Sequence, residues 1–179
     1  MKKWFKILIS VILISVLAAG ALQAGEYQEY PDDYSYLFEH GTSQKKDIEL
    51  SAVERIAILY TSSPLPQSLF LDMEDQKSYY DPGTDIFYNI QLSKYINDMN
   101  EDEKSELQEI WRDADFSNWE FYYEGTAQMD YECHFAIETE DEIYHYLIRG
   151  VDASAPENLQ KFISDILHTF WDSEILTAQ

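Results

Sequence analysis

"YECHFAIETEDEIYHYLIRG", residues 131–150, contains two largely apolar segments separated by the polar run "TEDE". A tight turn in that run would make residues 131–138 and 143–150 antiparallel strands. Phe135 then faces Tyr146 on an apolar side, while an acidic and a basic residue meet on the other side. Because both sides are chemically consistent in one register, the sequence predicts a β-hairpin.

Two segments outside this hairpin have the pattern of amphipathic helices. Residues 100–114, "NEDEKSELQEIWRDA", begin with Asn100 and Glu103 at the spacing of a capping box. Residues 154–171, "SAPENLQKFISDILHTFW", begin with a similar S-x-x-E signal. Apolar residues mark one face of each helix: Leu107, Ile110, Trp111 and Ala114 in the first, and Leu159, Phe162, Ile163, Ile166, Leu167 and Phe170 in the second. We expect both faces to pack on a sheet.

Further strands are predicted from short apolar or alternating runs bounded by turn residues. They are residues 54–62, a second hairpin of 68–73 and 77–81, and residues 118–124. Residues 86–97 fit either a strand or a helix, and we favour a strand for the first half. The sequence therefore predicts an α+β fold: an antiparallel sheet of about five to six strands with two helices packed on one face.

The first 24 residues have the three-part form of a secretory signal peptide. Three lysines precede an apolar run, and small residues follow, so cleavage is expected after Ala21 or Ala24. The alternative is an uncleaved anchor helix, although the apolar run is shorter than the ~20 residues that a membrane span prefers. We therefore predict a protein that is secreted or held at the extracellular face of an envelope.

The rest of the chain is predicted to contain one domain. Residues 25–47 are acidic and rich in tyrosine and show no clear period, which is typical of a tether. The alternative is that the tyrosines of this segment dock on the domain. Residues 48–179 are long enough for a single α+β domain with its own core.

Charge restricts the classes of partner. The formal net charge is −22, from 12 basic and 34 acidic residues. Three of the basic residues lie in the predicted leader, which leaves nine against 34 acidic ones. A surface this negative repels nucleic acid and anionic membranes, so neither is expected as a partner beyond the leader itself. Cations and basic protein surfaces would be attracted instead, although scattered acidic residues can also serve solubility alone.

Cys133 is the single cysteine, so an internal disulfide is impossible. Export without disulfides is typical of bacterial proteins rather than of eukaryotic secreted domains. In the predicted hairpin Cys133 faces the apolar side, whereas His134 and His145 face the other side. A thiol and a base on opposite sides cannot act together, so we predict no catalytic residues and a non-enzymatic role. The two histidines and Glu132 share a side and are a weaker candidate for a zinc or nickel site.

The strongest metal candidate is "DADFSNWEFYYE", residues 113–124. Asp113, Asp115, Ser117 and Glu124 occupy four ligand positions of an EF-hand calcium loop. The following segment alternates as a strand does, which would carry Glu124 far from Asp113. The alternative is a helix end, a polar turn and a strand. Apart from this calcium candidate, no cofactor is predicted.

Aromatic residues suggest one further role. Trp119, Phe121, Tyr123, Tyr144 and Tyr146 could form a platform for sugar rings, or a sheet face covered by the two helices, which we favour. The sequence as a whole predicts an exported, non-catalytic binding or interaction module with a protein or glycan partner at the cell surface. The alternatives are a calcium- or carbohydrate-binding accessory domain and a hydrolase of the envelope.

Overall fold

The computed structural model describes residues 32–39, 41, 44–62, 66–126, 131–150 and 153–170. All of them belong to one unit, residues 32–179. The predicted leader lies outside the described residues. None of the described helices combines the length and the hydrophobicity needed to cross a bilayer.

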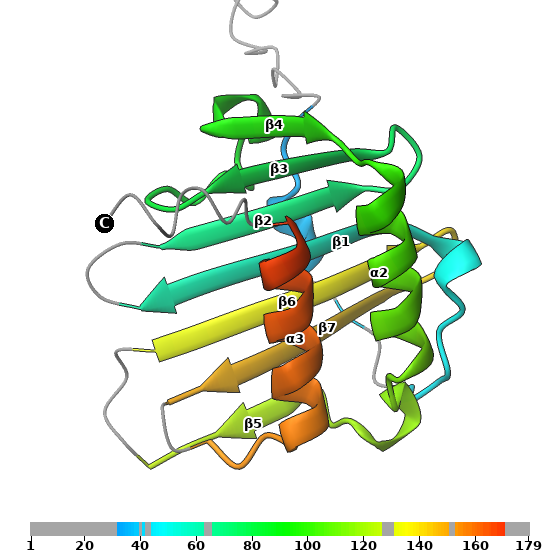
Figure 1. Ribbon diagram of the computed structural model, residues 1–179. Coiled ribbons are helices and arrows are strands. Elements are labelled where there is room, and N and C mark those ends of the chain that lie inside the picture. Colours follow the sequence, from blue (N-terminus) through cyan, green and yellow to red (C-terminus); the bar gives the residue numbers. More distant parts are fainter. Residues whose placement is uncertain are drawn as a thin grey trace, which may run out of the picture. The chain divides into compact units, whose positions relative to one another are not determined.

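The centre of the fold is a seven-stranded sheet with the order β4-β3-β2-β1-β6-β7-β5 (Figure 1). All neighbouring strands are antiparallel except β5 and β7, which are parallel. The α+β class is confirmed, but the predicted five to six strands are too few. The strands are β1 (Val53–Ser62), β2 (Gln67–Asp72), β3 (Lys77–Asp81), β4 (Tyr95–Asp98), β5 (Tyr122–Glu124), β6 (Tyr131–Thr139) and β7 (Ile143–Arg149).

The predicted register of the β6–β7 hairpin is confirmed. Phe135 pairs with Tyr146, and Cys133 pairs with Ile148 on the same side. Glu132 pairs with Arg149 on the other side, where the two side chains form an ion pair. The alternation of buried and half-buried residues along β7 shows which side faces the helices.

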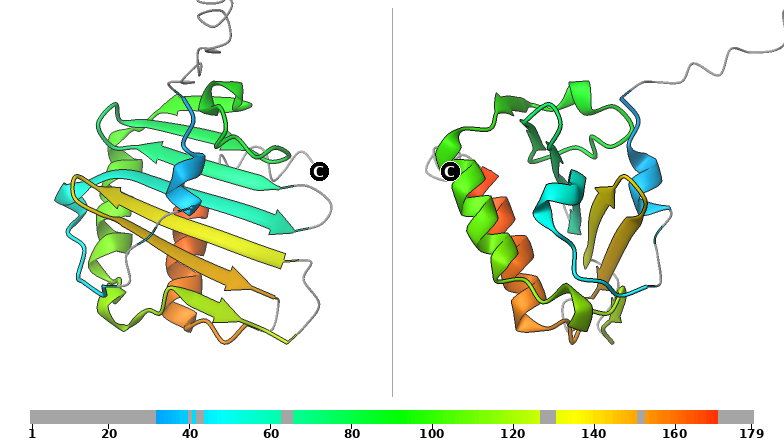
Figure 2. Two further views of the ribbon diagram at one scale, coloured as in Figure 1. Left: turned by 180° about the vertical axis from the view of Figure 1, so that it is seen from behind. Right: turned by 90° about the vertical axis from the view of Figure 1, so that its right-hand side faces the viewer.

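Two helices cover one face of the sheet, as predicted (Figures 1 and 2). They are α2 (Glu101–Arg112) and α3 (Glu157–Phe170). The Asn100 side chain accepts hydrogen bonds from the backbone N–H groups of Asp102 and Glu103, and the Glu103 carboxylate accepts one from the Asn100 N–H, so the capping box is confirmed. The described residues also contain four short 3-10 helices: η1 (Ser35–Phe38), η2 (Leu50–Ala52), η3 (Ile90–Leu92) and η4 (Phe116–Asn118).

The segment from residue 86 to residue 97 differs from its prediction, because its strand occupies the second half. Asp85 and Asn89 accept hydrogen bonds from the backbone two residues further on, which bends the first half into turns. Its apolar residues Ile86, Phe87 and Ile90 are buried against the second sheet face. A buried loop can be as apolar as a strand although its backbone is not extended. The strand β4 begins only at Tyr95.

The second sheet face is also covered, by this loop and by residues 32–39, here called the N-terminal segment (Figure 2). Leu37 is only 1% exposed, in a cluster with Phe70 and Phe87. The Tyr34 ring lies 4.4 Å from the Phe70 ring, and its backbone N–H donates to the Phe87 carbonyl. The predicted tether of residues 25–47 thus differs from the structure over residues 32–39, because their apolar side chains pack on the sheet.

A half-buried polar contact also holds the N-terminal segment. The Tyr36 hydroxyl lies 2.9 Å from both carboxylate oxygens of Glu138 on β6. Arg55 on β1 donates to the same carboxylate over 2.7 Å. Burial, followed by the hydrogen bond to Glu138, raises the pKa of Tyr36, so the hydroxyl stays protonated and can donate.

Candidate functional site

Nearly all basic side chains of the domain are already paired with acidic ones. The nine lysines and arginines beyond the predicted leader all lie in described segments, and seven of them are within ion-pairing distance of a carboxylate. The pairs are Lys45–Glu120, Lys46–Glu142, Arg55–Glu138, Lys104–Glu101, Arg112–Asp113, Arg149–Glu132 and Lys161–Asp165. The remaining carboxylates far outnumber the basic groups, so the outer surface is strongly negative.

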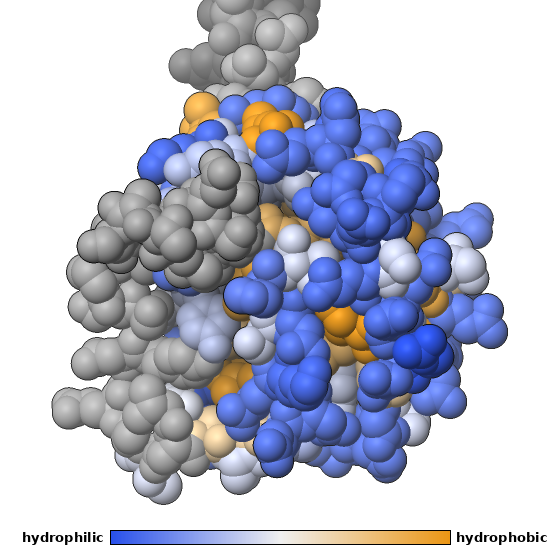
Figure 3. Space-filling view, in the orientation of Figure 1, coloured by the Kyte–Doolittle hydropathy of each residue, from blue (hydrophilic) through white to orange (hydrophobic). Residues whose placement is uncertain are grey.

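Four acidic side chains line a groove between α2 and α3, here called the acidic groove. It has a volume of about 390 Å³. Its lining residues are Glu106, Glu109, Ile110 and Asp113 on the α2 side, and Asn158, Lys161, Phe162 and Asp165 on the α3 side. Each helix contributes residues three, four and seven positions apart, which lie on one helical face. Figure 3 shows apolar surface at the bottom of this largely hydrophilic region between the helices.

Lys161 is the one basic residue among those lining the acidic groove. Its ammonium group is hydrogen-bonded to Asp165, one turn further along α3. This hydrogen bond is the main reason that the pKa of Lys161 is raised, and the charge of Asp113 contributes. The groove therefore has an excess of carboxylates over an apolar floor, which is suited to a cationic group on an apolar stem.

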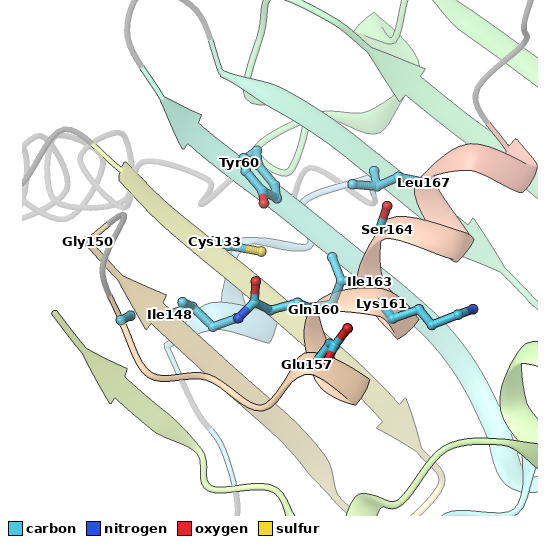
Figure 4. A pocket seen from close by; sticks show the side chains of 11 residues that line it. Tyr60, Cys133, Ile148, Gly150, Glu157, Gln160, Lys161, Ile163, Ser164 and Leu167 are labelled. Atoms are coloured by element: carbon cyan, nitrogen blue, oxygen red, sulfur yellow. The ribbon is translucent and has the colours of Figure 1, made fainter.

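A second hollow, here called the α3 pocket, lies between the other side of α3 and the ends of β1, β6 and β7 (Figure 4). Its volume is about 560 Å³. Strand residues supply Tyr60, Cys133 and Ile148, the connection to α3 supplies Gly150 and Ala153, and α3 supplies Glu157, Gln160, Lys161, Ile163, Ser164 and Leu167. Apolar and polar groups are thus both present, with the polar ones concentrated on α3.

Cys133 belongs to this pocket but is only 1% exposed, as predicted for a core residue. Burial raises the pKa of its thiol, which keeps the sulfur in the protonated, weakly nucleophilic form. His134 and His145 lie on the opposite side of the sheet, as the hairpin register requires. The geometry therefore provides no base for this thiol among the histidines of β6 and β7.

His134 and His145 form a pair on the second sheet face. His134 Nδ1 and His145 Nε2 lie 3.1 Å apart, within hydrogen-bonding distance and far closer than diagonal backbone neighbours would suggest. On its other side, His134 Nε2 lies 3.4 Å from Glu132. The Phe38 ring centroid lies 5.5 Å from that of His134 and 5.7 Å from that of His145. Among the described residues no group of three or more His, Cys, Asp or Glu side chains is arranged to hold a metal ion.

The histidine pair leads to a prediction about pH. Burial, and then the charge of His134, lowers the pKa of His145 to about 4. The pKa of His134 is lowered too, mainly by burial. Glu132 and Asp85 raise this pKa, and Arg149 lowers it further. Between the unfolded pKa of about 6.5 and pH 4 the unfolded chain binds more protons, so stability falls as the pH falls. Between pH 7 and pH 4.5, the free energy of unfolding should fall by about 2 kcal/mol more in the wild type than in a His145→Gln variant.

Denaturant unfolding of both proteins at the two pH values measures this difference. The comparison with the variant removes the common effect of the many carboxylates. Equal losses in the two proteins would contradict the assignment of a neutral, half-buried His145.

The structure places the four predicted calcium ligands as follows. Asp113 ends α2, Ser117 lies in η4, and Glu124 is the last residue of β5. Asp115 accepts hydrogen bonds from the Asn118 side-chain amide and the Ser117 hydroxyl, so its carboxylate is engaged by two side chains of the same turn. Calcium binding at these residues stays a prediction, since they do not form a recognisable ligand group within the part of the chain that the structure describes.

The aromatic residues considered for sugar binding are covered by the helices. Trp119 is fully buried, and Tyr144 and Tyr146 are 4% and 1% exposed. Phe121 and Tyr123 pack at the margin of the same cluster. The favoured prediction of a helix-covered face is therefore confirmed.

Sequence reasoning identified neither the acidic groove nor the α3 pocket. The helical spacing of Glu106, Glu109 and Asp113 was a usable signal for one wall of the groove. The other wall depends on how α3 lies beside α2, which no local pattern reports. A scan against protein-family models and a search of curated proteins found no match to this chain.

Proposed function

We propose that this chain is an exported, non-catalytic binding module that recognises a positively charged segment of a protein partner at the cell surface. The observation that carries the proposal is the acidic groove, which is lined by four carboxylates and by a single lysine that is already paired with one of them. Most other basic side chains are also paired, which supports the proposal. Few basic groups of the chain itself therefore remain to compete with the basic groups of a partner.

The groove suits lysine and arginine more than it suits a simple cation. Both side chains carry an apolar stem below a charged head. Ile110 and Phe162 at the groove floor offer apolar contact, and Glu106, Glu109 and Asp113 offer acceptors along one wall. Attraction between opposite charges would also speed encounter with the partner and weaken with salt.

The non-catalytic part of the proposal is supported by the titratable groups. The buried Cys133 thiol is protonated and has both nearby histidines on the far side of the sheet. Those histidines hydrogen-bond to each other beneath Phe38, which is the arrangement of a packed polar pair. In a binding role, Cys133, His134 and His145 need only to pack within the fold.

The test is the affinity of the mature chain, residues 25–179, for a fluorescent lysine-rich peptide, measured by anisotropy at low salt. The groove variant is Glu106→Gln, Glu109→Gln, Asp113→Asn. The matched control removes three exposed carboxylates elsewhere, as Glu74→Gln, Asp75→Asn, Glu140→Gln. The groove variant should bind about tenfold more weakly, from about 0.5 kcal/mol per exposed charge contact, and the control should stay near the wild type.

Two outcomes would contradict the proposal. Equal weakening by both variants would show attraction to overall charge without a site. Affinity for the peptide no higher than for a glutamate-rich peptide of equal length would exclude basic segments as the partner class.

A further inference from the structure

The α3 pocket has an apolar interior. Ile148, Ile163 and Leu167 line it together with the neutral thiol of Cys133. Because the thiol stays protonated, it adds no charge to this interior and behaves as a small apolar group. The interior therefore favours an aliphatic chain over a charged or strongly hydrated group.

Glu157 and Gln160 supply hydrogen-bond acceptors at this pocket, beside the hydroxyls of Tyr60 and Ser164, which can both donate and accept. The Gln160 amide nitrogen donates to the Ala155 carbonyl over 2.7 Å. This contact turns the amide oxygen toward Cys133 and Tyr60 (Figure 4). Glu157, at the first turn of α3, adds a carboxylate. An ammonium group has three donors and no acceptor, so it matches these groups better than a carboxylate or a phosphate would.

The cation at the pocket margin does not neutralise it. Lys161 is hydrogen-bonded to Asp165, and Figure 4 shows its side chain directed away from Cys133 and Tyr60. The carboxylate of Glu157 therefore gives the pocket its net negative charge. The pocket combines an apolar interior with one carboxylate and an amide oxygen at its polar side.

We propose that the α3 pocket binds a primary alkylammonium group, as carried by a lysine side chain. The inference rests on the proposed function, because a lysine of the basic segment is the source that the acidic surface would attract. The aliphatic stem lies against Ile148, Ile163 and Leu167, and the ammonium group donates to Glu157 and the Gln160 oxygen. A free aliphatic amine has the same chemistry and would bind in the same way.

The experiment is a titration of the isotope-labelled mature chain, residues 25–179, followed by NMR. The probes are n-pentylammonium, Nα-acetyl-lysine amide, n-pentanol and pentanoate. Saturable shifts at Tyr60, Ile148 and Gln160 are expected for the two ammonium probes, with a dissociation constant of about millimolar for such small ligands. Pentanol should bind at least about fivefold more weakly, and pentanoate should not bind, because each lacks the charge-assisted contact.

Two variants locate the effect. Glu157→Gln should weaken n-pentylammonium binding about fivefold or more through loss of that contact. The matched control Glu74→Gln changes the same residue type at an exposed position outside both hollows and should leave pocket binding unchanged. Equal binding of pentylammonium and pentanol, shifts centred on other residues, or no effect of Glu157→Gln would each overturn the inference.

The two proposals fail separately. If the lysine-rich peptide depends on the groove carboxylates and is insensitive to Glu157→Gln, the proposed function stands and the pocket inference falls. If the small ammonium probes bind the pocket while the peptide does not bind, the proposed function falls. Binding of n-pentylammonium with no binding of Nα-acetyl-lysine amide would assign the pocket to a free amine, and would overturn the link to a lysine of the partner.

Discussion

Replacing Phe162 with alanine is expected to lower the free energy of unfolding by about 3–5 kcal/mol, the range for a buried aromatic residue. Phe162 lies on α3 and is 3% exposed. Its ring centroid lies 5.2–5.6 Å from those of Trp111, Phe116, Trp119 and Phe135. These residues come from α2, the connection that follows it, and β6, so one side chain joins both helices to the sheet.

Denaturant unfolding of residues 25–179 measures this effect. The expected loss is a large part of the 5–15 kcal/mol that typically stabilises a domain, so the variant should unfold at much lower denaturant. Tyr88→Ala removes an aromatic residue that is 65% exposed and should change stability by no more than about 0.5 kcal/mol. A loss below about 1 kcal/mol for Phe162→Ala would contradict the packing of both helices on this face.

Leu37→Ala is expected to destabilise the domain by about 2–5 kcal/mol, the range for a buried leucine. Leu37 belongs to the N-terminal segment, is 1% exposed and lies in the cluster on the second sheet face. If residues 25–47 were a tether throughout, this substitution would have almost no effect. The expected loss therefore distinguishes a packed segment from a solvated one.

Leu92→Ala is the matched control for this experiment. It makes the same substitution at a residue that is 69% exposed, and a change within about 0.5 kcal/mol is expected. Denaturant unfolding of both variants in the mature chain gives the comparison. Similar small effects for the two leucines would show that residues 32–39 do not contribute to the core.

The parts of the fold that could be predicted from the sequence are those with a strong local period. The β6–β7 hairpin has one register in which Phe135 meets Tyr146 and Glu132 meets Arg149, and the structure has that register. Both helices have a capping or start signal followed by an apolar stripe, and both are present. In each case neighbouring residues contain enough information to specify the element.

The errors occur where burial depends on distant residues. Leu37 and Phe87 have no helical or strand period, yet both are buried because they cover the same sheet face. The parallel pairing of β5 with β7 likewise depends on where the chain returns after α2. Asp85 and Asn89 hold turns through side-chain hydrogen bonds, which apolar periodicity alone does not reveal.

The same reasoning applies to the candidate site. The stripe of Glu106, Glu109 and Asp113 could be read from α2 alone, but the groove also needs Asp165 and Phe162 from α3. The prediction about Cys133 was correct because strand alternation alone places it opposite the histidines. Long-range helix packing, by contrast, leaves no signature in either helix separately.

The acidic groove is tested most directly by a map of the backbone amide shifts of labelled residues 25–179 on addition of the lysine-rich peptide. Binding in the acidic groove should give saturable, salt-sensitive shifts concentrated on the groove residues of α2 and α3, among them Glu106, Glu109 and Asp165. Small shifts spread evenly over all exposed carboxylates, or shifts centred on the second sheet face, would contradict a binding module that recognises basic segments through its acidic groove.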